Sequence, residues 1–433
     1  MADSQSSVSP VSKASLPRRT IVAVAIGNFV EWFDFALYAI FASIIATVFF
    51  PSDNELTSLL TTFAVFGVAI VARPAGALLF GHLGDRMGRS RTLSTVILLM
   101  SVSTALIGLL PSHATAGAIA PVCLVMLRVF QGFAAGGEYG GAASYVLETA
   151  PPERRGLYAS IAIWTQLFAV AVGLLTGTLL SRSLTADQLA SWGWRLPFLL
   201  ALPLGAVGLY MRRKLEDPAV FIAASTSGEV HSAPLAALLR GHGRDLLKVV
   251  GLVVYGTSGA YLLLYLPTYS QTILEVSPGT SFGAALAALL AATASVPVSA
   301  AVSDRIGRRP CLLAMSMIAT VLMYPAFLLL HGDSAAYLAA HLVIGFVVGA
   351  YAGPMSAAIA EAFPTALRYS GLSVGYGVAT SVFGGMTPLA LTALLGATGN
   401  QLAPAWFFIA TALISFGAAW VTAETAGKPL RAS

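Results

Sequence analysis

The chain has 433 residues, of which 57% are hydrophobic and only 10% are charged, and its formal net charge is +5. Because soluble domains carry about 25% charged residues, this composition excludes an ordinary water-soluble protein. It indicates a helical membrane protein, since the backbone must satisfy its own hydrogen bonds inside a bilayer.

Apolar runs long enough to cross a membrane, about 20 residues each, recur along the whole sequence. We predict twelve spanning helices, at residues 20–47, 57–81, 91–110, 118–147, 157–180, 194–211, 248–272, 282–301, 311–330, 335–360, 371–395 and 404–422. The predicted domains are a cytoplasmic tail at 1–19, a six-helix bundle at 20–212, a linker at 213–247, a second six-helix bundle at 248–422 and a cytoplasmic tail at 423–433.

Most of the 24 lysines and arginines precede the first predicted span or follow the second, fourth, sixth, eighth, tenth and twelfth. Such residues accumulate in short cytoplasmic loops, so both termini are expected in the cytoplasm. This distribution accounts for the positive charge without nucleic-acid binding.

Two motifs are repeated at nearly the same distance. The sequence GDRMGR at 84–89 returns as SDRIGR at 303–308, 219 residues later, and the pattern E-x-x-P-x-x-x-R at 148–155 returns at 361–368, 213 residues later. Either motif alone would be weak, but the shared period indicates that one half of the chain repeats the other.

With these motifs the chain resembles the major facilitator superfamily. The segments GNFVEWFDF at 27–35, RP at 73–74 and WGWRLPF at 192–198 resemble its metabolite:proton symporter branch, and so does the pattern R-x-x-Q-G-x-x-x-G-G-E-Y at 128–139. The resemblance implies an all-α fold of two pseudo-symmetric six-helix bundles and transport of proline, glycine betaine or organic acids. The segments at 363–372 and 424–430 are similar to proline/betaine transporters, whereas FGGMTP at 383–388 is similar to citrate and dicarboxylate permeases.

Five charged residues fall inside predicted spans, where a charge costs about 2.5 to 3.5 kcal/mol on insertion scales. They are Glu31, Asp34, Arg73, Arg128 and Glu138. Glu31 and Asp34, three residues apart on one helix face, are candidates for proton coupling because two close acids cannot both ionise cheaply. A structural hydrogen bond or ion pair with the fourth predicted helix is the alternative. Arg73 is expected to serve helix packing.

Arg128, Gln131 and Glu138 follow one helical stripe, with Tyr139 next to its end. Arg128 and Gln131 are expected to face the central cavity, where a guanidinium suits a substrate carboxylate; a salt bridge from Arg128 to Asp34 or Glu31 is the alternative. Glu138 is a candidate gate or second proton site, with an ordinary ion pair as the alternative. Tyr139 joins the substrate-binding candidates.

A polar wall is expected in the second half. Tyr261, Tyr265 and Tyr269 share one helix face, and Trp164 and Gln166 on the fifth predicted helix complete the candidate site. Aromatic rings can hold a quaternary ammonium by cation–π contact. Helix packing is the alternative for each tyrosine, and His341 is expected to be a packing residue.

The repeated loop motifs are expected to form ion pairs that break as the halves rock, with simple anchoring of the loops as the alternative. The gating candidates are Asp85, Arg86, Arg89, Glu148, Arg154, Arg155, Asp304, Arg308, Glu361 and Arg368.

These observations predict a proton-coupled symporter of the inner membrane that imports a small organic carboxylate (mono-, di- or tricarboxylate). Uptake of a zwitterionic osmolyte such as proline or glycine betaine is the alternative, and an efflux antiporter is less favoured. Protons, the substrate and lipid are the expected partners of a functional monomer. No enzyme motif, cofactor site or metal site is predicted, and Cys123 and Cys311 are expected to be packing residues.

Overall fold

The computed structural model describes residues 18–76, 79–80, 89–136, 150–213 and 240–430. The helices of the first half are α1 (Arg18–Ile40), α2 (Ala42–Phe49), α3 (Glu55–Val71), α5 (Arg89–Leu109), α6 (His113–Ala116), α7 (Ile119–Ala135), η1 (Pro152–Arg154), α9 (Arg155–Ser183), α10 (Ala186–Gln188), η2 (Leu189–Gly193) and α11 (Arg195–Arg213). Those of the second half are α14 (Gly243–Thr272), α15 (Pro278–Ile306), α16 (Arg308–Leu329), α17 (Ser334–Glu361), α18 (Thr365–Ala379), η3 (Thr380–Gly385), α19 (Thr387–Thr398) and α20 (Ala403–Val421).

Within the described residues, the twelve predicted spans correspond to twelve apolar units. Eight are helices long enough to cross a membrane, two are bent helix pairs and two are shorter apolar helices, Ser94–Leu109 and Ile119–Ala135. The first predicted span bends by 64° between α1 and α2, and the sixth begins earlier than predicted, at residue 186, with a bend of 42°. Most of the predicted linker lies outside the described residues.

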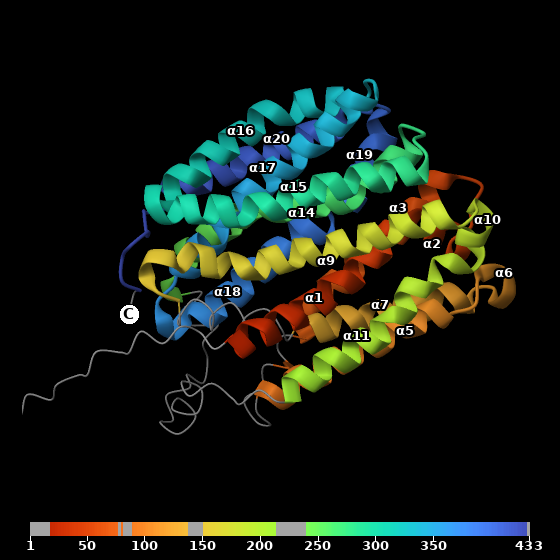
Figure 1. The fold of residues 1–433 in the computed structure, drawn as a ribbon, viewed down its shortest axis with the longest axis horizontal. Coiled ribbons are helices and arrows are strands. Elements are labelled where there is room, and N and C mark those ends of the chain that lie inside the picture. Colours follow the sequence, from red (N-terminus) through yellow and green to blue (C-terminus); the bar gives the residue numbers. More distant parts are fainter. Residues whose placement is uncertain (1–17, 77–78, 81–88, 137–149, 214–239, 431–433) are drawn as a thin grey trace, which may run out of the picture.

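The helices form one elongated bundle (Figure 1). Most of the second half, in green to blue, lies above the first half, and α9 runs beside α15 along the boundary between them. One end of the bundle carries the starts of α9 and α16 and residues 424–430, and we call it the basic end. The other end, with α6 and α10, is called the far end.

Glycines let two helix pairs approach at backbone distance. In the second half, Gly345, Gly349 and Gly353 stand four residues apart on α17 against α15, and a Cβ atom at Gly349 would lie 2.2 Å from the carbonyl oxygen of Ala292. In the first half, a Cβ atom at Gly132 of α7 would lie 1.5 Å from a carbonyl oxygen of α3. Small residues at such spacing are the usual means of close helix packing in membranes.

The two halves touch at the far end and in the middle of the boundary between them. At the far end, the Phe282 ring of α15 lies 6.3 Å from that of Phe41, and Leu56 of α3 contacts Gly396 of α19. Between α18 and α19 the chain forms the π-helix η3, where the Ser381 hydroxyl donates to the Ile70 carbonyl of the first half at 3.3 Å. The structure is therefore closed around its centre.

Candidate functional site

Asp34 is the centre of a buried polar network. It lies on α1 with 2% of its surface exposed, and its Oδ1 accepts hydrogen bonds from the Thr104 hydroxyl on α5 and from Gln131 Nε2 on α7, the latter at 2.9 Å. Arg128 Nη1 donates to Gln131 Oε1 at 2.8 Å. Four side chains from three helices thus form one network inside the first half.

The network leaves its two charged groups partly unsatisfied. Among the described residues, Asp34 Oδ2 and the Nε and Nη2 atoms of Arg128 have no hydrogen-bond partner. The guanidinium of Arg128 lies over the rings of Tyr38 and Phe35, at 4.2 and 5.0 Å from their centroids. Arg128 therefore reaches Asp34 through Gln131 rather than by a direct ion pair.

Glu31 has a different partner from Asp34. Its Oε1 lies 3.1 Å from Nη2 of Arg73, just beyond α3, and the two side chains are 5% and 13% exposed. Arg73 also lies over Phe35 and Trp32, at 4.4 and 5.7 Å from the ring centroids. Each charge could be singled out because it lies inside an apolar run, but the pairing of Arg73 with Glu31 could not be inferred from spacing along the chain.

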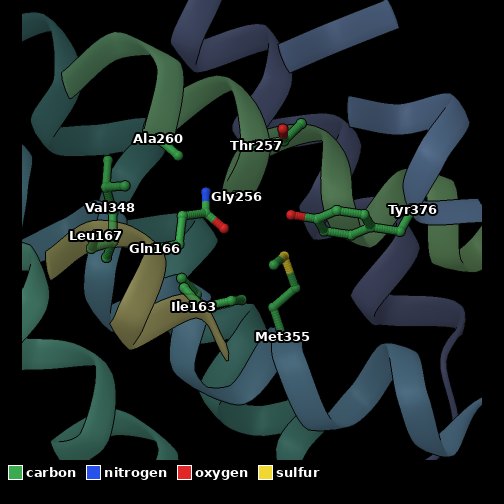
Figure 2. Close-up of a pocket in the computed structure, with 10 residues that line it drawn as sticks. Ile163, Gln166, Leu167, Gly256, Thr257, Ala260, Val348, Met355 and Tyr376 are labelled. Atoms are coloured by element: carbon green, nitrogen blue, oxygen red, sulfur yellow. The ribbon is translucent and has the colours of Figure 1, made fainter. Parts of the chain in front are cut away.

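A small cavity lies between the halves (Figure 2). Its volume is about 20 Å³, which is room for about one water molecule. It is lined by Ile163, Gln166, Leu167, Gly256, Thr257, Ala260, Val348, Ala352, Met355 and Tyr376. The Gln166 amide and the Tyr376 hydroxyl point toward each other into it, with Met355 beside them. The polar lining is thus contributed by both halves.

The three predicted tyrosines are buried but do not line this cavity. The Tyr261 ring lies 6.0 Å from that of Trp32, across the boundary between the halves. The Tyr265 hydroxyl is 3.0 Å from Thr392 Oγ1, and the Tyr269 hydroxyl donates to the Gln401 carbonyl at 2.8 Å. Tyr261 is therefore the tyrosine of this set nearest the charged residues of the first half.

The two residues predicted on α9 lie in different surroundings. Gln166 is 6% exposed and lines the cavity. Trp164 is 38% exposed, and its ring stacks on that of Phe168 at 5.3 Å on the outside of the bundle. A separation of two residues turns a helical side chain by about 200°, so the two cannot share a face.

Several predicted gating residues meet where α9 begins. Both oxygens of Asp304 accept backbone N–H groups from the first turn of α9, from Gly156 at 2.8 Å and Leu157 at 3.1 Å. Arg308 Nη2 lies 2.7 Å from Asp304 Oδ1, and its Nε lies 3.5 Å from Glu361 Oε2. The Asp304 carboxylate of the second half therefore caps a helix of the first half. We call Asp304, Arg308, Glu361 and the first turn of α9 the latch.

Other gating candidates lie beside or outside the latch. Arg155 Nη1 is 3.8 Å from Glu361 Oε1, Arg154 is exposed, and the buried Arg368 donates from Nε to the Ala360 carbonyl at 3.0 Å. Only the backbone of Arg89 is described. The candidates outside the described residues are Asp85, Arg86, Glu138, Tyr139 and Glu148.

The last residues of the chain join the latch, which the sequence analysis did not predict. Glu424 accepts backbone N–H groups from Arg308 at 2.9 Å and from Arg309 at 3.0 Å, at the start of α16, and from the two residues that follow it. Burial alone would raise the pKa of Glu424, but these four donors hold the pKa below its ordinary value. The Thr425 hydroxyl donates to Glu361 Oε2 at 2.6 Å, so the tail is fastened to the latch.

Acids, histidines and cysteines do not gather into a metal site in the part of the chain that the structure describes.

Comparisons with known proteins agree with this architecture. The family model described as "Sugar (and other) transporter" matches residues 20–232 and 220–432. A chain from Staphylococcus aureus (strain COL) is 36% identical over 426 residues, which cover 97% of this chain and 91% of that one. The proline/betaine transporter of Escherichia coli (strain K12) is 33% identical over 425 residues, covering 96% of this chain and 85% of that one.

A solved structure shows the same fold. The proton:xylose symporter XylE bound to 6-bromo-6-deoxy-D-glucose superposes with a TM-score of 0.75 at 17% identity, covering 95% of this chain and 97% of that one. The major facilitator fold predicted from the sequence is thereby confirmed. The chain belongs to the sugar (and other) transporter family of the major facilitator superfamily, whose members are multi-pass membrane transporters and not enzymes.

Proposed function

We propose that the protein is a proton-coupled symporter that takes up a small zwitterion, of the class of proline or glycine betaine, by alternating access. The buried network around Asp34 carries the proposal, because a proton-driven carrier needs an acid that can gain and lose a proton away from bulk water. The relatives named proline/betaine transporters favour a zwitterion over the organic carboxylate that we first expected.

The two oxygens of Asp34 suggest how a proton is bound. Oδ1 is held by Thr104 and Gln131, while Oδ2 is buried without a partner in the described structure. An ionised carboxylate with an unsatisfied buried oxygen is costly, so Oδ2 is the atom that takes the proton. When Asp34 is ionised, the guanidinium of Arg128, already linked to it through Gln131, supplies the compensating charge.

The latch and the cavity support the transport cycle. We assign the basic end to the cytoplasm because lysines and arginines accumulate there. The cavity of about 20 Å³ is too small for proline or betaine, so the halves must separate to admit either. Asp304 then holds the cytoplasmic side closed while the far end opens, and it releases α9 when the halves rock the other way.

Uptake into proteoliposomes with an imposed pH gradient tests the proposal. We expect saturable accumulation of proline or glycine betaine that a protonophore abolishes, and no accumulation of citrate or α-ketoglutarate. Asp34→Asn should lose accumulation by at least about tenfold and keep counterflow exchange, because binding survives without the proton. The control is Asp187→Asn, an exposed acid at the far end. Unchanged accumulation in Asp34→Asn, or accumulation of carboxylates alone, would contradict the proposal.

A further inference from the structure

The pair formed by Arg73 and Glu31 is buried but incompletely satisfied. Nη2 of Arg73 lies 3.1 Å from Glu31 Oε1 as an ion pair without hydrogen-bond geometry, and Nε has no hydrogen-bond partner among the described residues. An arginine offers five N–H groups in a planar fork that fits a carboxylate with two parallel hydrogen bonds. Arg73 is therefore a charged donor in the interior with capacity for a further carboxylate.

The surroundings of the pair accept cations. The guanidinium of Arg73 lies 5.7 Å from the Trp32 ring centroid, and the Tyr261 ring meets Trp32 edge-on at 6.0 Å. Tyr261 also contacts Phe66 at 5.9 Å. Aromatic faces arranged in this way attract quaternary and secondary ammonium groups as well as arginine. A negative group, Glu31, and an aromatic wall thus stand together beside one cation.

The pair also lies where a transported molecule has to pass. Trp32 and Glu31 belong to the first half, whereas Tyr261 belongs to α14 of the second half. Tyr261 follows Thr257, which lines the central cavity, by one turn of α14, and a Cβ atom at Gly384 would lie 2.7 Å from the first side chain and 2.5 Å from the second. The buried hydroxyl of Tyr261 has no hydrogen-bond partner among the described residues. Through the contact of Trp32 with Tyr261, the pair lies close to the cavity on the boundary between the halves.

We propose that the Arg73–Glu31 pair is the recognition site for the zwitterion, an assignment that rests on the proposed function. The substrate carboxylate binds the fork of Arg73, and its ammonium group binds Glu31 against the rings of Trp32 and Tyr261. Without substrate the two side chains neutralise each other. The Glu31 carboxylate then takes the place of the substrate carboxylate, and the Arg73 guanidinium takes the place of the substrate ammonium group.

This arrangement selects zwitterions by charge balance. A zwitterion replaces both members of the pair at once, so neither Arg73 nor Glu31 is left unpaired. A simple carboxylate would occupy Arg73 and break its ion pair with Glu31 without supplying a cation in return, and a simple cation would do the reverse. Because breaking a buried ion pair by removing one partner is strongly unfavourable, both are rejected.

Equilibrium binding to the purified full-length protein in nanodiscs, by calorimetry, tests the assignment with three ligands. Glycine betaine carries both charges, 3,3-dimethylbutyrate has the same shape and carboxylate without the cation, and choline has the cation without the carboxylate. We expect the wild type to bind betaine at least about 100-fold more tightly than 3,3-dimethylbutyrate. Glu31→Gln should weaken betaine binding by about 30-fold or more and strengthen 3,3-dimethylbutyrate binding, because the carboxylate then occupies Arg73 without depriving a buried anion of its partner.

Two further variants complete the design. Arg73→Gln should weaken betaine and 3,3-dimethylbutyrate binding together, since both use the same fork. Trp32→Leu should weaken betaine binding more than 3,3-dimethylbutyrate binding, and it provides a test if Glu31→Gln does not fold. The matched control is Arg309→Gln, which removes an arginine that also lies 5.7 Å from a tryptophan ring, that of Trp420, at the surface. It should leave all three affinities unchanged.

The possible failures are distinguishable. If Glu31→Gln, or Trp32→Leu in its place, weakens betaine and 3,3-dimethylbutyrate equally, the pair is structural and the assignment is overturned. If the wild type accumulates betaine and the variants keep its discrimination, the assignment fails while the proposed function stands. If the wild type neither accumulates betaine nor binds it better than 3,3-dimethylbutyrate, both fail.

Discussion

Asp304, near the end of α15, accepts the backbone N–H of Gly156, in the first turn of α9, at 2.8 Å. Carboxylates are stabilised at helix N-termini by the unpaired N–H groups and by the helix dipole. In this protein the cap and the helix come from different halves. We therefore expect this stabilisation only while the halves are closed at the basic end, and we propose that Asp304 favours that closed state.

Replacing Asp304 should open the basic end. Asp304→Asn removes the negative charge from the α9 terminus and from Arg308, so we expect the closed state to lose about 1 to 2 kcal/mol, or about 5- to 30-fold in population. Hydrogen exchange of the Gly156 and Leu157 amides should accelerate by that factor. The matched control is Asp333→Asn, because Asp333 caps α17 within its own half, with Oδ1 2.9 Å from the Ala336 nitrogen. Equal acceleration at residues 156–157 in both variants would contradict this role.

The docking of the chain's last residues should depend on pH. The pKa of Glu424 in the folded protein lies below its ordinary value, so its contribution is complete above the unfolded value of about 4.3 and is lost as pH falls through the folded value. Pulsed hydrogen exchange of residues 424–428, corrected for intrinsic rates, should show about two- to fivefold weaker protection below that point. Glu424→Gln should already show the weaker protection at pH 7 and little further change on acidification. A wild-type profile independent of pH would exclude this role for Glu424.

Two neighbours on α9 should differ in their effect on uptake. Gln166 faces the cavity, so Gln166→Ala should raise the KM for the transported zwitterion by about tenfold, the value of one hydrogen bond. Trp164 stacks on Phe168 at the outer surface, and Trp164→Ala should change KM by less than about twofold. Initial uptake rates in proteoliposomes measure both. A larger effect of Trp164 than of Gln166 would mean that the cavity is not the path of the substrate.

The close packing of α17 on α15 should not tolerate a methyl group. A Cβ atom at Gly349 would lie 2.2 Å from the Ala292 carbonyl oxygen and 2.3 Å from Ser295 Oγ, so Gly349→Ala should cost about 1 to 3 kcal/mol. The matched control is Gly417→Ala on α20, where nothing lies within 4 Å of the added atom and a gain of up to about 1 kcal/mol is expected from helix propensity. Apparent melting temperatures in one detergent should move in opposite directions.

The fold could be predicted because its determinants are local. The length of each apolar run and the alternation of basic loops follow directly from the bilayer. The bend between α1 and α2 and the π-helix η3 were not predictable, because tertiary packing decides where a continuous apolar run departs from regular helix.

The site was predicted only in part, for a different physical reason. Intramembrane charge singled out Asp34 and Arg128, and both belong to the buried network. Partners are a property of three-dimensional contact, however, and the sequence offered no sign that Arg73 would face Glu31 or that Glu424 would cap α16. Trp164 illustrates the same limit: a polar aromatic residue on a membrane helix predicts an interface, but not which one.

The wide turn of η3 interrupts the eleventh span where that span meets the first half, with Ser381 donating to the Ile70 carbonyl. Its flanking helices α18 and α19 run to opposite ends of the bundle, and Gly385 within it contacts Ile70 of the first half. A π-turn interrupts the regular hydrogen-bond ladder and is a usual place for a helix to kink. We therefore expect the two flanks to bend relative to each other at η3 when the halves rock. If one flank moves while the other stays packed, the boundary opens at one end only and no continuous pore forms.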